Sequence, residues 1–389
     1  MRICVLLQDL YGGGAERAML QLAAGLAERP CDVDLLLVRR EGAYLDAISP
    51  KLRVSELGTG RMLNSIAALA RYLRRERPDA LISALPHVNV GALLAATLAR
   101  TATRVIVTEH SMISRTAEVE TARTVRLSHR MVPWLYPRAT GIVTVSDGVA
   151  DDLARFCGIA RSRIDVIYNG IITDDLYRRA EEPCHHPWLA AGQPPVVLAA
   201  GRLVAVKNYS LLVRAFARLR AERPARLLIL GDGDERDQLR ALADDLGVGA
   251  DVGLEGFVAN PFPFMKRASV FVQSSHWEGL PTVLIEALAC GTRVVATDCP
   301  GGTREILENG ALGDLAPVDD PEALAAGMRR AIERAGPAVE FTSKARQFSL
   351  ERAVDAYLRL AFGPQPPKSG KALQVETANR HEEAASHHH

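Results

Sequence analysis

The sequence has almost no surplus charge, few cysteines and no long hydrophobic run. In its 389 residues, 47 Lys and Arg face 46 Asp and Glu, and this net charge of +1 argues against a nucleic-acid binder with a strongly basic surface. The six cysteines form no C-x-x-C pair, so we expect reduced thiols and a cytosolic protein. No apolar run approaches about 18 residues, and the apolar start ends at Gln8-Asp9, so we expect neither a transmembrane helix nor a secretory signal.

Short β-branched segments alternate with longer helical segments along most of the chain. The expected strands are Ile3–Leu7, Val33–Val38, Ala80–Ser83, Val105–Thr108, Gly141–Val145, Asp165–Tyr168, Val196–Ala200, Arg226–Leu230, Asp251–Gly256, Val270–Gln273 and Arg293–Thr297. Helical segments such as Ala15–Glu28, Tyr209–Glu222 and Thr282–Cys290 lie between them. This alternation is typical of α/β domains in which helices cover both faces of a parallel sheet.

The alternation is interrupted once, which divides the chain into two domains. Residues 171–194 are rich in acidic residues, proline and glycine, and we interpret them as a linker. The sequence therefore predicts two Rossmann-like, doubly wound α/β domains, at residues 1–170 and 195–345. Ligands of such sheets bind at the carboxyl ends of the strands, so two facing domains would share one site in the cleft between them. We expect a helix over 346–363 that returns to the first domain, and a disordered tail with part of a purification tag over 364–389.

A glycine-rich turn follows the first expected strand. Glycines at Gly13 and Gly14 allow backbone N–H groups to approach an anion at a helix N-terminus, although a turn that needs only flexible residues would look the same. The turn differs from the G-x-G-x-x-G pattern of dinucleotide-binding proteins, because Arg17 stands in place of the third glycine. Arg39-Arg40 also stand where a nicotinamide site would have an acidic residue.

Two further segments carry candidate ligands of an anionic substrate. Arg202 and Lys207 follow the strand Val196–Ala200, where two cations would suit a diphosphate, although they could also be solvated surface charges. Glu278 and Glu286 flank a Gly-Leu-Pro turn that enters a helix, so backbone N–H groups could face an anion and the carboxylates could accept sugar hydroxyls. Two exposed helix acids would give the same spacing.

Taken together, these segments resemble the retaining GT-B glycosyltransferases of glycosyltransferase family 4, whose signature is E-x7-E. The resemblance covers roughly residues 1–335 and keeps the family's order of motifs. The matching segments are Gly12-Gly13-Gly14-Ala15-Glu16-Arg17-Ala18, Glu109-His110-Ser111, Val145-Ser146, Tyr168-Asn169-Gly170, Gly201-Arg202-Leu203, Lys207-Asn208, Gly231-Asp232-Gly233, Gly256-Phe257 and Glu278 through Glu286. They look most like enzymes that transfer sugars or amino sugars to lipid-linked saccharides or surface glycans.

The resemblance implies a role for each candidate residue. Arg202 and Lys207 would clamp the donor diphosphate, with backbone N–H groups of Gly13 or Gly14 and of Gly279-Leu280. Glu286 would bind the ribose, Glu278 the transferred sugar, and Gly256, Phe257 and Val258 would lie against the nucleobase. His110 would face the reacting sugar from the first domain. The implied catalytic residues are therefore His110, Arg202, Lys207 and Glu278.

The implied reaction transfers a sugar from a nucleotide-diphosphate donor to a saccharide or polyprenyl-linked acceptor with an α-linkage. We favour a UDP-sugar, such as a UDP-N-acetylhexosamine, over GDP-mannose. No cofactor and no metal is expected, because cations and oriented amides would stabilise the leaving diphosphate. Two alternatives remain, namely a catalytically silent glycan-binding module and, less favoured, a nicotinamide-dependent oxidoreductase.

Two segments have the composition of a metal site, and a third is basic and partly apolar. Asp232-Gly233-Asp234 spells D-x-D, but it follows a strand and opens a helix, so turn and cap roles suffice. Cys184-His185-His186 lacks a second pair of ligands. Residues 115–138 mix five arginines with Trp134, Tyr136 and aliphatic residues, so this segment could rest on an anionic membrane surface or be a solvated helix. We therefore expect a cytoplasmic protein with peripheral membrane contact, and no nucleic-acid partner.

Overall fold

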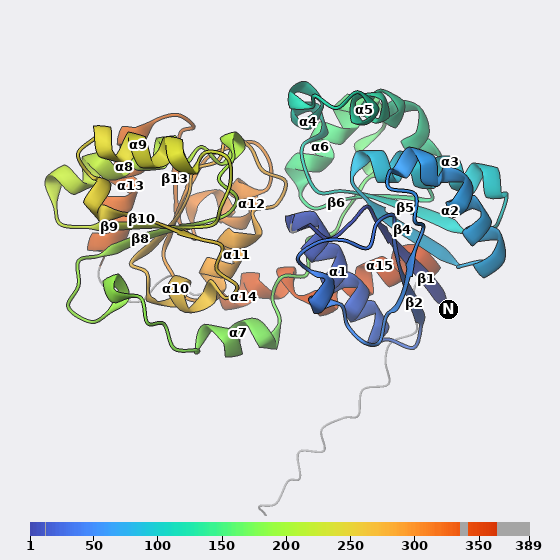
Figure 1. The fold of residues 1–389 in the computed structure, drawn as a ribbon, viewed down its shortest axis with the longest axis horizontal. Coiled ribbons are helices and arrows are strands. Elements are labelled where there is room, and N and C mark those ends of the chain that lie inside the picture. Colours follow the sequence, from blue (N-terminus) through green and yellow to red (C-terminus); the bar gives the residue numbers. More distant parts are fainter. Residues whose placement is uncertain (12, 335–340, 364–389) are drawn as a thin grey trace, which may run out of the picture.

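The computed structural model describes residues 1–11, 13–334 and 341–363, and it contains two parallel sheets, each covered by helices on both faces (Figure 1). The strands of the first sheet are β1 (Arg2–Leu7), β2 (Asp32–Leu37), β3 (Arg53–Glu56), β4 (Ala80–Ala84), β5 (Arg104–Glu109), β6 (Gly141–Thr144) and β7 (Asp165–Val166). Their order is β3-β2-β1-β4-β5-β6-β7. The prediction of Rossmann-like α/β domains is confirmed.

The second sheet has the order β10-β9-β8-β11-β12-β13. Its strands are β8 (Val196–Ala200), β9 (Arg226–Leu230), β10 (Val252–Gly256), β11 (Val270–Gln273), β12 (Val294–Thr297) and β13 (Asp314–Ala316). The sequence analysis missed β3 and β13. Both are short strands at the edge of a sheet, and they carry polar residues such as Arg53 and Asp314, so neither forms the apolar run that marks a buried strand.

The helices that cover the first sheet are α1 (Gly14–Ala27), α2 (Met62–Glu76), α3 (Pro86–Ala99), α4 (Ile113–Val119), α5 (Arg123–Leu135), α6 (Asp147–Cys157) and α15 (Leu350–Phe362). The others are α7 (Asp174–Ala180), α8 (Tyr209–Glu222), α9 (Arg236–Asp245), α10 (Phe262–Arg267), α11 (Thr282–Ala289), α12 (Thr303–Ile306), α13 (Pro321–Glu333) and α14 (Thr342–Ala345). Each sheet is buried on both faces, because successive residues of β1 and β8 belong to apolar clusters on opposite sides.

The segment expected as a linker, 171–194, connects the sheets but is not without structure. It contains α7, whose Leu176 and Ala180 pack in an apolar cluster with α10 and α11 of the second domain. The Arg179 guanidinium also donates to the carbonyl of Ala259 and lies over the Phe262 ring, 5.1 Å from its centre. Acidic and proline residues flank this helix, and its contacts with the second domain could not be inferred from its composition.

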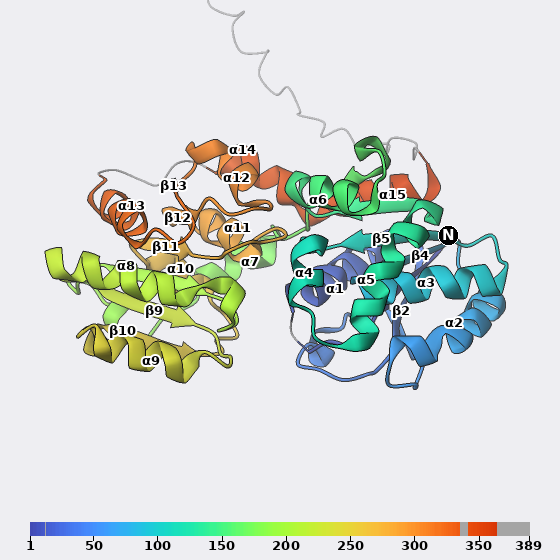
Figure 2. The same ribbon diagram turned by 90° about the horizontal axis from the view of Figure 1, so that it is seen from above.

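Helix α15 carries the chain back across to the first domain, where it lies beside α1 (Figures 1 and 2). Ala353, Val354, Tyr357, Leu358 and Ala361 are buried among residues of β1, β2 and α1. Arg29, just after α1, pairs with Asp355 at 2.8 Å, and Arg104 of β5 donates to the carbonyl of Ala361. The expected tail, 364–389, lies outside the described residues, as does Gly12 of the glycine-rich turn.

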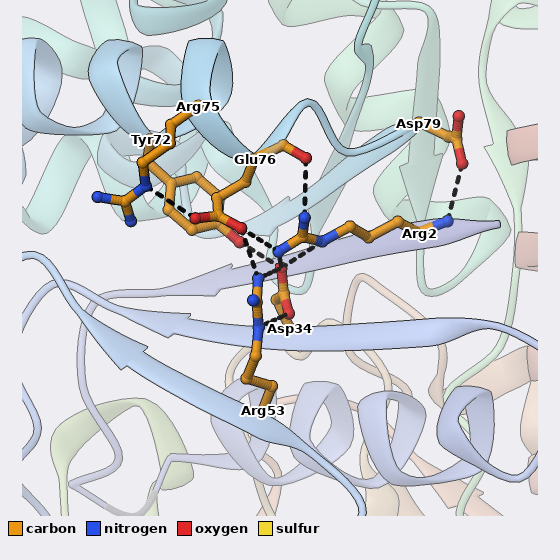
Figure 3. A network of polar contacts seen from close by, with 7 residues as sticks. All are labelled: Arg2, Asp34, Arg53, Tyr72, Arg75, Glu76 and Asp79. Atoms are coloured by element: carbon orange, nitrogen blue, oxygen red, sulfur yellow. Dashed lines mark hydrogen bonds and ion pairs between the residues drawn. The ribbon is translucent and has the colours of Figure 1, made fainter.

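A polar network ties the amino ends of three strands together, at the edge of the first sheet opposite the glycine-rich turn (Figure 3). The Asp34 carboxylate is almost fully buried and accepts hydrogen bonds from Arg2, Arg53 and Tyr72 at 2.5 to 3.0 Å. Glu76 of α2 pairs with both arginines. The network joins β1, β2, β3 and α2 by charge-assisted hydrogen bonds, so we assign it a structural role.

Candidate active site

The two domains meet in backbone contact where carboxyl-end loops of the two sheets face each other. A Cβ atom on Gly279 would lie 1.9 Å from the carbonyl oxygen of His110, and one on Gly148 would lie 2.7 Å from that of Gly301. The Ser146 hydroxyl donates to the carbonyl of Gly279 at 2.8 Å. Only glycine allows backbones to approach this closely, so the contact depends on glycines of both domains.

Lys207 and Glu278 form an ion pair on the second domain's side of this contact. Lys207 Nζ lies 2.7 Å from Glu278 Oε1, which also accepts from the Ser275 hydroxyl at 2.6 Å. Glu278 is only 8% exposed, and its backbone N–H donates to the carbonyl of Pro300. Lys207 is held in turn, because the Ser274 hydroxyl donates to its carbonyl. The structure thus brings two predicted site residues together as a charge pair.

Glu286 and Arg17 form a second ion pair, and this one joins the domains. Arg17 of α1 lies 2.8 Å from Glu286 Oε1 of α11, and the Glu286 side chain is completely buried. Burial raises the pKa of Glu286, whereas Arg17 opposes the shift. Oε2 of Glu286 is also buried, and it has no hydrogen-bond partner among the residues that the structure describes. A buried carboxylate oxygen without a partner is costly, so this atom marks a position for a donor from a ligand.

The remaining predicted cation, Arg202, is exposed beside the first domain's glycine-rich turn. Burial raises the pKa of Glu16, and the positive charge of Arg202 acts against that shift, so the two residues are close enough to interact across the domains. Gly13 is the N-cap of α1 in extended conformation and its carbonyl accepts from Arg17 N–H. A Cβ atom on Gly14 would meet nothing within 4 Å, so the backbone there is open to a ligand.

His110 ends β5 directly against Gly279. The Thr108 hydroxyl donates to the carbonyl of Ser83, so it must accept the proton of His110 Nε2 at 3.1 Å. This leaves Nδ1 as the hydrogen-bond acceptor of a neutral ring, and Nδ1 is buried without a partner. Burial lowers the pKa of His110 to about 4. The imidazole is therefore a poor proton acceptor near neutral pH but can orient a hydroxyl group.

Gly256, Phe257 and Val258 lie at the end of β10, away from both ion pairs. Gly256 has φ +75°, and its carbonyl accepts from the N–H of Gly231 at 2.7 Å. Phe257 is 74% exposed, so its aromatic face is available to a planar ligand. Leu280, by contrast, is buried between the domains with Met112 and Val149, and only its backbone could serve a ligand.

Sequence reasoning assigned no role to three residues at this junction. Glu16 and Arg17 belong to a segment that resembles the family, but neither has a predicted role there, and Tyr44 is not among the predicted site residues. The charges of Arg17, Glu16, Glu286 and Arg202 all act on the Tyr44 hydroxyl, whose pKa is raised mainly by burial. The sequence signal was the Ala-Glu-Arg that follows the glycines, but Glu286 lies too far along the chain for the pairing to be inferred.

The two discounted metal motifs have local roles. Asp232 Oδ1 accepts from the N–H of Gly233 and lies 3.7 Å from Arg236, as expected of a turn and helix start. His186 Nδ1 accepts from the N–H of Trp188. Within residues 1–11, 13–334 and 341–363, no three His, Cys, Asp or Glu side chains gather as a metal-binding group. In the same part of the chain, every helix is too short or too polar to cross a bilayer.

Family models match both halves of the chain. The model described as Glycosyltransferase Family 4 matches residues 12–175, and that described as Glycosyl transferases group 1 matches residues 182–348. Together they span most of the sequence, and the division between them falls at the segment that connects the two sheets.

Curated relatives and solved structures agree with these models. An N-acetylgalactosamine-N,N'-diacetylbacillosaminyl-diphospho-undecaprenol 4-alpha-N-acetylgalactosaminyltransferase of Campylobacter jejuni is 34% identical over 203 residues, 52% of this chain and 53% of that protein. The match therefore spans about half of that relative. A lipopolysaccharide core biosynthesis glycosyltransferase, LpsE of Rhizobium meliloti, is 27% identical over 90% of this chain and 95% of its own length.

Among solved structures, HepE of Anabaena in complex with UDP has a TM-score of 0.70 at 22% identity and covers 93% of this chain and 96% of its own. A glycosyltransferase from Rickettsia africae has a TM-score of 0.77 at 19% identity, with 92% and 97% covered. At these identities the likeness concerns the fold.

Proposed function

Because the chain belongs to the GT-B glycosyltransferases, with a family 4 domain followed by a group 1 domain, we propose that it transfers a sugar from a nucleotide-diphosphate donor to a saccharide or lipid-linked acceptor. The donor is a UDP-sugar in preference to GDP-mannose, and the new bond is an α-linkage made with retention. The observation that carries the proposal is the pairing of buried charges at the domain junction, Lys207 with Glu278 and Arg17 with Glu286.

In this proposal, cations and backbone amides hold the donor diphosphate. Arg202 is exposed and its charge acts on Glu16 in the first turn of α1, and the Lys207 side chain is 25% exposed. A guanidinium and an ammonium group stabilise the charge that develops on the diphosphate as the glycosidic bond breaks. Backbone N–H groups at Gly13, Gly14 and Leu280 add dipoles at helix N-termini. These groups stabilise the negative charge of the leaving diphosphate, so the proposal requires no metal ion.

The nucleoside is bound by Glu286 and by the end of β10. The unpartnered Oε2 of Glu286 accepts a hydrogen bond from a ribose hydroxyl, which removes the cost of burying that oxygen. The nucleobase lies against the exposed ring of Phe257, with Gly256 and Val258 beside it. Stacking on an aromatic face does not by itself distinguish uracil from guanine.

Glu278 and His110 orient the sugars at the reacting centre. Glu278 Oε1 already accepts from Lys207 and Ser275, so this carboxylate is a hydrogen-bond acceptor for sugar hydroxyls and not a nucleophile. The ring of His110 is neutral, and its Nδ1 accepts a hydrogen bond from a hydroxyl group but does not remove the proton. The acceptor hydroxyl attacks from the face of the leaving group and gives its proton to the leaving phosphate, so a second carboxylate is not needed.

The acceptor proposal also includes contact with an anionic membrane surface through residues 115–138. Leu127 is 51% exposed and Trp134 is 74% exposed on α5, where Arg123, Arg126 and Arg130 are also exposed. An amphipathic basic helix of this kind suits a membrane interface, and a lipid-linked acceptor would be presented there. The relative from Campylobacter jejuni is named for an undecaprenol-linked substrate, which supports this choice.

Charge reversal tests the membrane contact. The variant Arg123→Glu/Arg126→Glu should lose co-sedimentation with vesicles of phosphatidylglycerol, whereas the matched variant Arg214→Glu/Arg218→Glu on α8 should keep it. Equal sedimentation of folded wild type and both variants would remove the membrane contact from the proposal.

A nucleotide panel tests the central proposal. Calorimetry with UDP, GDP, ADP, CMP and NADH, each with and without magnesium, should give binding of UDP without magnesium. Binding of GDP alone would change the donor to a GDP-sugar. Binding of NADH alone would support the oxidoreductase, and binding of UDP without turnover of any UDP-sugar would support the silent glycan-binding module.

A further inference from the structure

Four neighbouring strands of the first sheet each deliver a polar side chain to the same edge. Arg39 follows β2, Asp9 follows β1, His87 lies in the first turn after β4, and His110 ends the row after β5. Because the order in the sheet is β2-β1-β4-β5, these residues lie in that order along its carboxyl edge, and His110 is at the end that contacts Gly279 of the second domain. The proposed function uses only His110, at the near end of the row.

The far end of the row is a built cluster of charged and aromatic groups. Arg39 lies 2.6 Å from Asp9 Oδ2 and 3.6 Å from Glu41, and its guanidinium lies 5.6 Å from the centre of the Tyr11 ring. The Tyr11 hydroxyl donates to Glu41 at 2.7 Å. Asp9 is 8% exposed, whereas Tyr11 is 61% exposed, so a buried carboxylate lies beside an open aromatic face.

Backbone hydrogen bonds hold the two loops of this cluster together before any ligand binds. Leu10 N–H donates to the carbonyl of Glu41, and Tyr44 N–H donates to that of Leu10. Gly42 has φ +125°, and a Cβ atom there would lie 2.0 Å from the backbone of Leu10. The loops are therefore preorganised, and a glycine is required where they cross.

Buried polar atoms without partners accumulate along the same edge. Gln8 Oε1, Arg39 Nε and His110 Nδ1 are all buried and have no hydrogen-bond partner in the described part of the chain. Both ring nitrogens of His129, which is 4% exposed, are in the same condition, and the charge of His129 reaches His87. Buried polar atoms are normally paired, so such a concentration indicates a surface that a ligand or water completes.

The chemistry of the cluster favours a neutral sugar. Asp9 and Glu41 outnumber Arg39, so the charges do not favour a phosphate or another anion. Sugars offer hydroxyl groups, which donate to carboxylates and accept from a guanidinium, and an apolar ring face, which packs on an aromatic ring. A carboxylate, a guanidinium and an exposed tyrosine therefore match one sugar residue.

We propose that Asp9, Tyr11, Arg39 and His87 form an acceptor track that binds a neutral oligosaccharide of at least two sugar units, with its reactive end at His110. The inference rests on the proposed function and specifies its acceptor. Three strand spacings separate Arg39 from His110, a distance of about 14 Å. This distance exceeds the length of a single sugar ring, so one sugar could not engage both ends.

A glycan array tests the track. Protein saturated with UDP is applied to printed neutral mono-, di- and trisaccharides of α-linked N-acetylhexosamines, and retention is measured for wild type, Asp9→Asn, Tyr11→Ala and the control Tyr177→Ala. Tyr177 is a 43% exposed tyrosine on α7, away from the track. We expect wild type and control to retain di- or trisaccharides more strongly than monosaccharides, and both track variants to bind the longer glycans about tenfold or more weakly.

Calorimetry of each variant with UDP separates this proposal from the proposed function. Unchanged UDP affinity in the track variants is expected, because Asp9 pairs with Arg39 and Tyr11 donates to Glu41, and neither partner belongs to the proposed donor site. Equal glycan retention by track variants and wild type, or no retention of any glycan by UDP-bound wild type, would overturn the track and leave the donor site in place. Loss of UDP binding by wild type would instead contradict the proposed function. Because Tyr11 is exposed, Tyr11→Ala remains informative if Asp9→Asn fails to fold.

Discussion

At the scale of single residues, the site consists of charges that the fold has already paired. Lys207 neutralises Glu278 within the second domain, and Arg17 neutralises Glu286 from the first. A ligand with a diphosphate and several hydroxyls would have to replace part of these ion pairs with its own contacts to the same side chains. The cost of burying the carboxylates is thus met by protein cations when no ligand is bound.

Removal of the Lys207 ammonium group should weaken donor binding. Lys207→Ala is expected to reduce UDP affinity by about tenfold or more, because a charge-assisted contact contributes roughly 1.5–3 kcal/mol. Titration calorimetry with UDP measures the effect. Lys51→Ala is the matched control, because Lys51 is an exposed lysine paired with Glu28 far from the site. Equal UDP affinity for Lys207→Ala and wild type would remove Lys207 from the donor site.

Glu109 predicts a pH dependence of stability. Burial raises the pKa of Glu109 to about 7, although Tyr136 and Asn89 donate to the carboxylate. Because the pKa is about 4.5 in the unfolded chain, the folded state binds more protons between these values, and the free energy of unfolding falls as the pH rises through that window. Between pH 5 and pH 8, the free energy of unfolding of wild type should fall by about 2–3 kcal/mol more than that of Glu109→Gln.

Denaturant unfolding at both pH values, with Glu56→Gln as the exposed control, measures that difference. His110 has the opposite sign, since burial lowers its pKa, and its contribution is lost below about pH 6.5. The two residues therefore act in opposite directions over the same acidic pH range, and the comparison with Glu109→Gln isolates the contribution of Glu109, because both proteins keep His110. If the free energy of unfolding changed equally for wild type and Glu109→Gln between the two pH values, the pKa of Glu109 would not be raised by folding.

At the scale of helices and strands, the sequence predicted the buried elements and missed the polar ones. The apolar runs of β1, β4, β8 and β11 were visible because strands buried on both faces are continuously hydrophobic. β3 and β13 lie at sheet edges and lack such runs. The site residues on loops were predictable individually, because strand-end positions are defined by the strands before them. Their partners across the domain junction depend on tertiary contacts that no local pattern encodes.

The Asp34 network predicts which strand contact is most sensitive to substitution. Asp34→Asn removes the charge that Arg2 and Arg53 share, and the loss should destabilise the first domain by roughly 1–3 kcal/mol, because both arginines are partly exposed and keep Glu76 as a partner. Urea unfolding followed by circular dichroism measures this change. Asp32→Asn, at an exposed position of the same strand, should change stability by less than about 0.5 kcal/mol.

At the scale of the whole molecule, Arg17 and Glu286 form an ion pair between the domains at the site. Arg17→Met leaves a completely buried carboxylate without its cation, so we expect the domains to separate further when no nucleotide is bound. Small-angle X-ray scattering should give a larger radius of gyration for Arg17→Met than for wild type, and UDP should reduce the difference.

Arg40→Met is the control for that experiment, because Arg40 is exposed on the same domain. Arg17→Met should lower the free energy of unfolding by roughly 1–3 kcal/mol. This is less than for a fully buried pair, because Arg17 is one-third exposed. Identical scattering of Arg17→Met and wild type would mean that the other contacts between the domains, such as Leu280 against Met112 and Val149, hold them together without this ion pair.

The second crossing of the chain, through α15, has a consequence for how the gene could be divided. A break at the connection before α7 would give two polypeptides, and the second would contain α15, whose apolar face belongs to the core of the first. The two products would therefore recognise each other as subunits of a heterodimer. Helix α15, which now packs on the first domain within one chain, would then bind that domain as part of a separate polypeptide. The protein would therefore be suited to split-protein complementation.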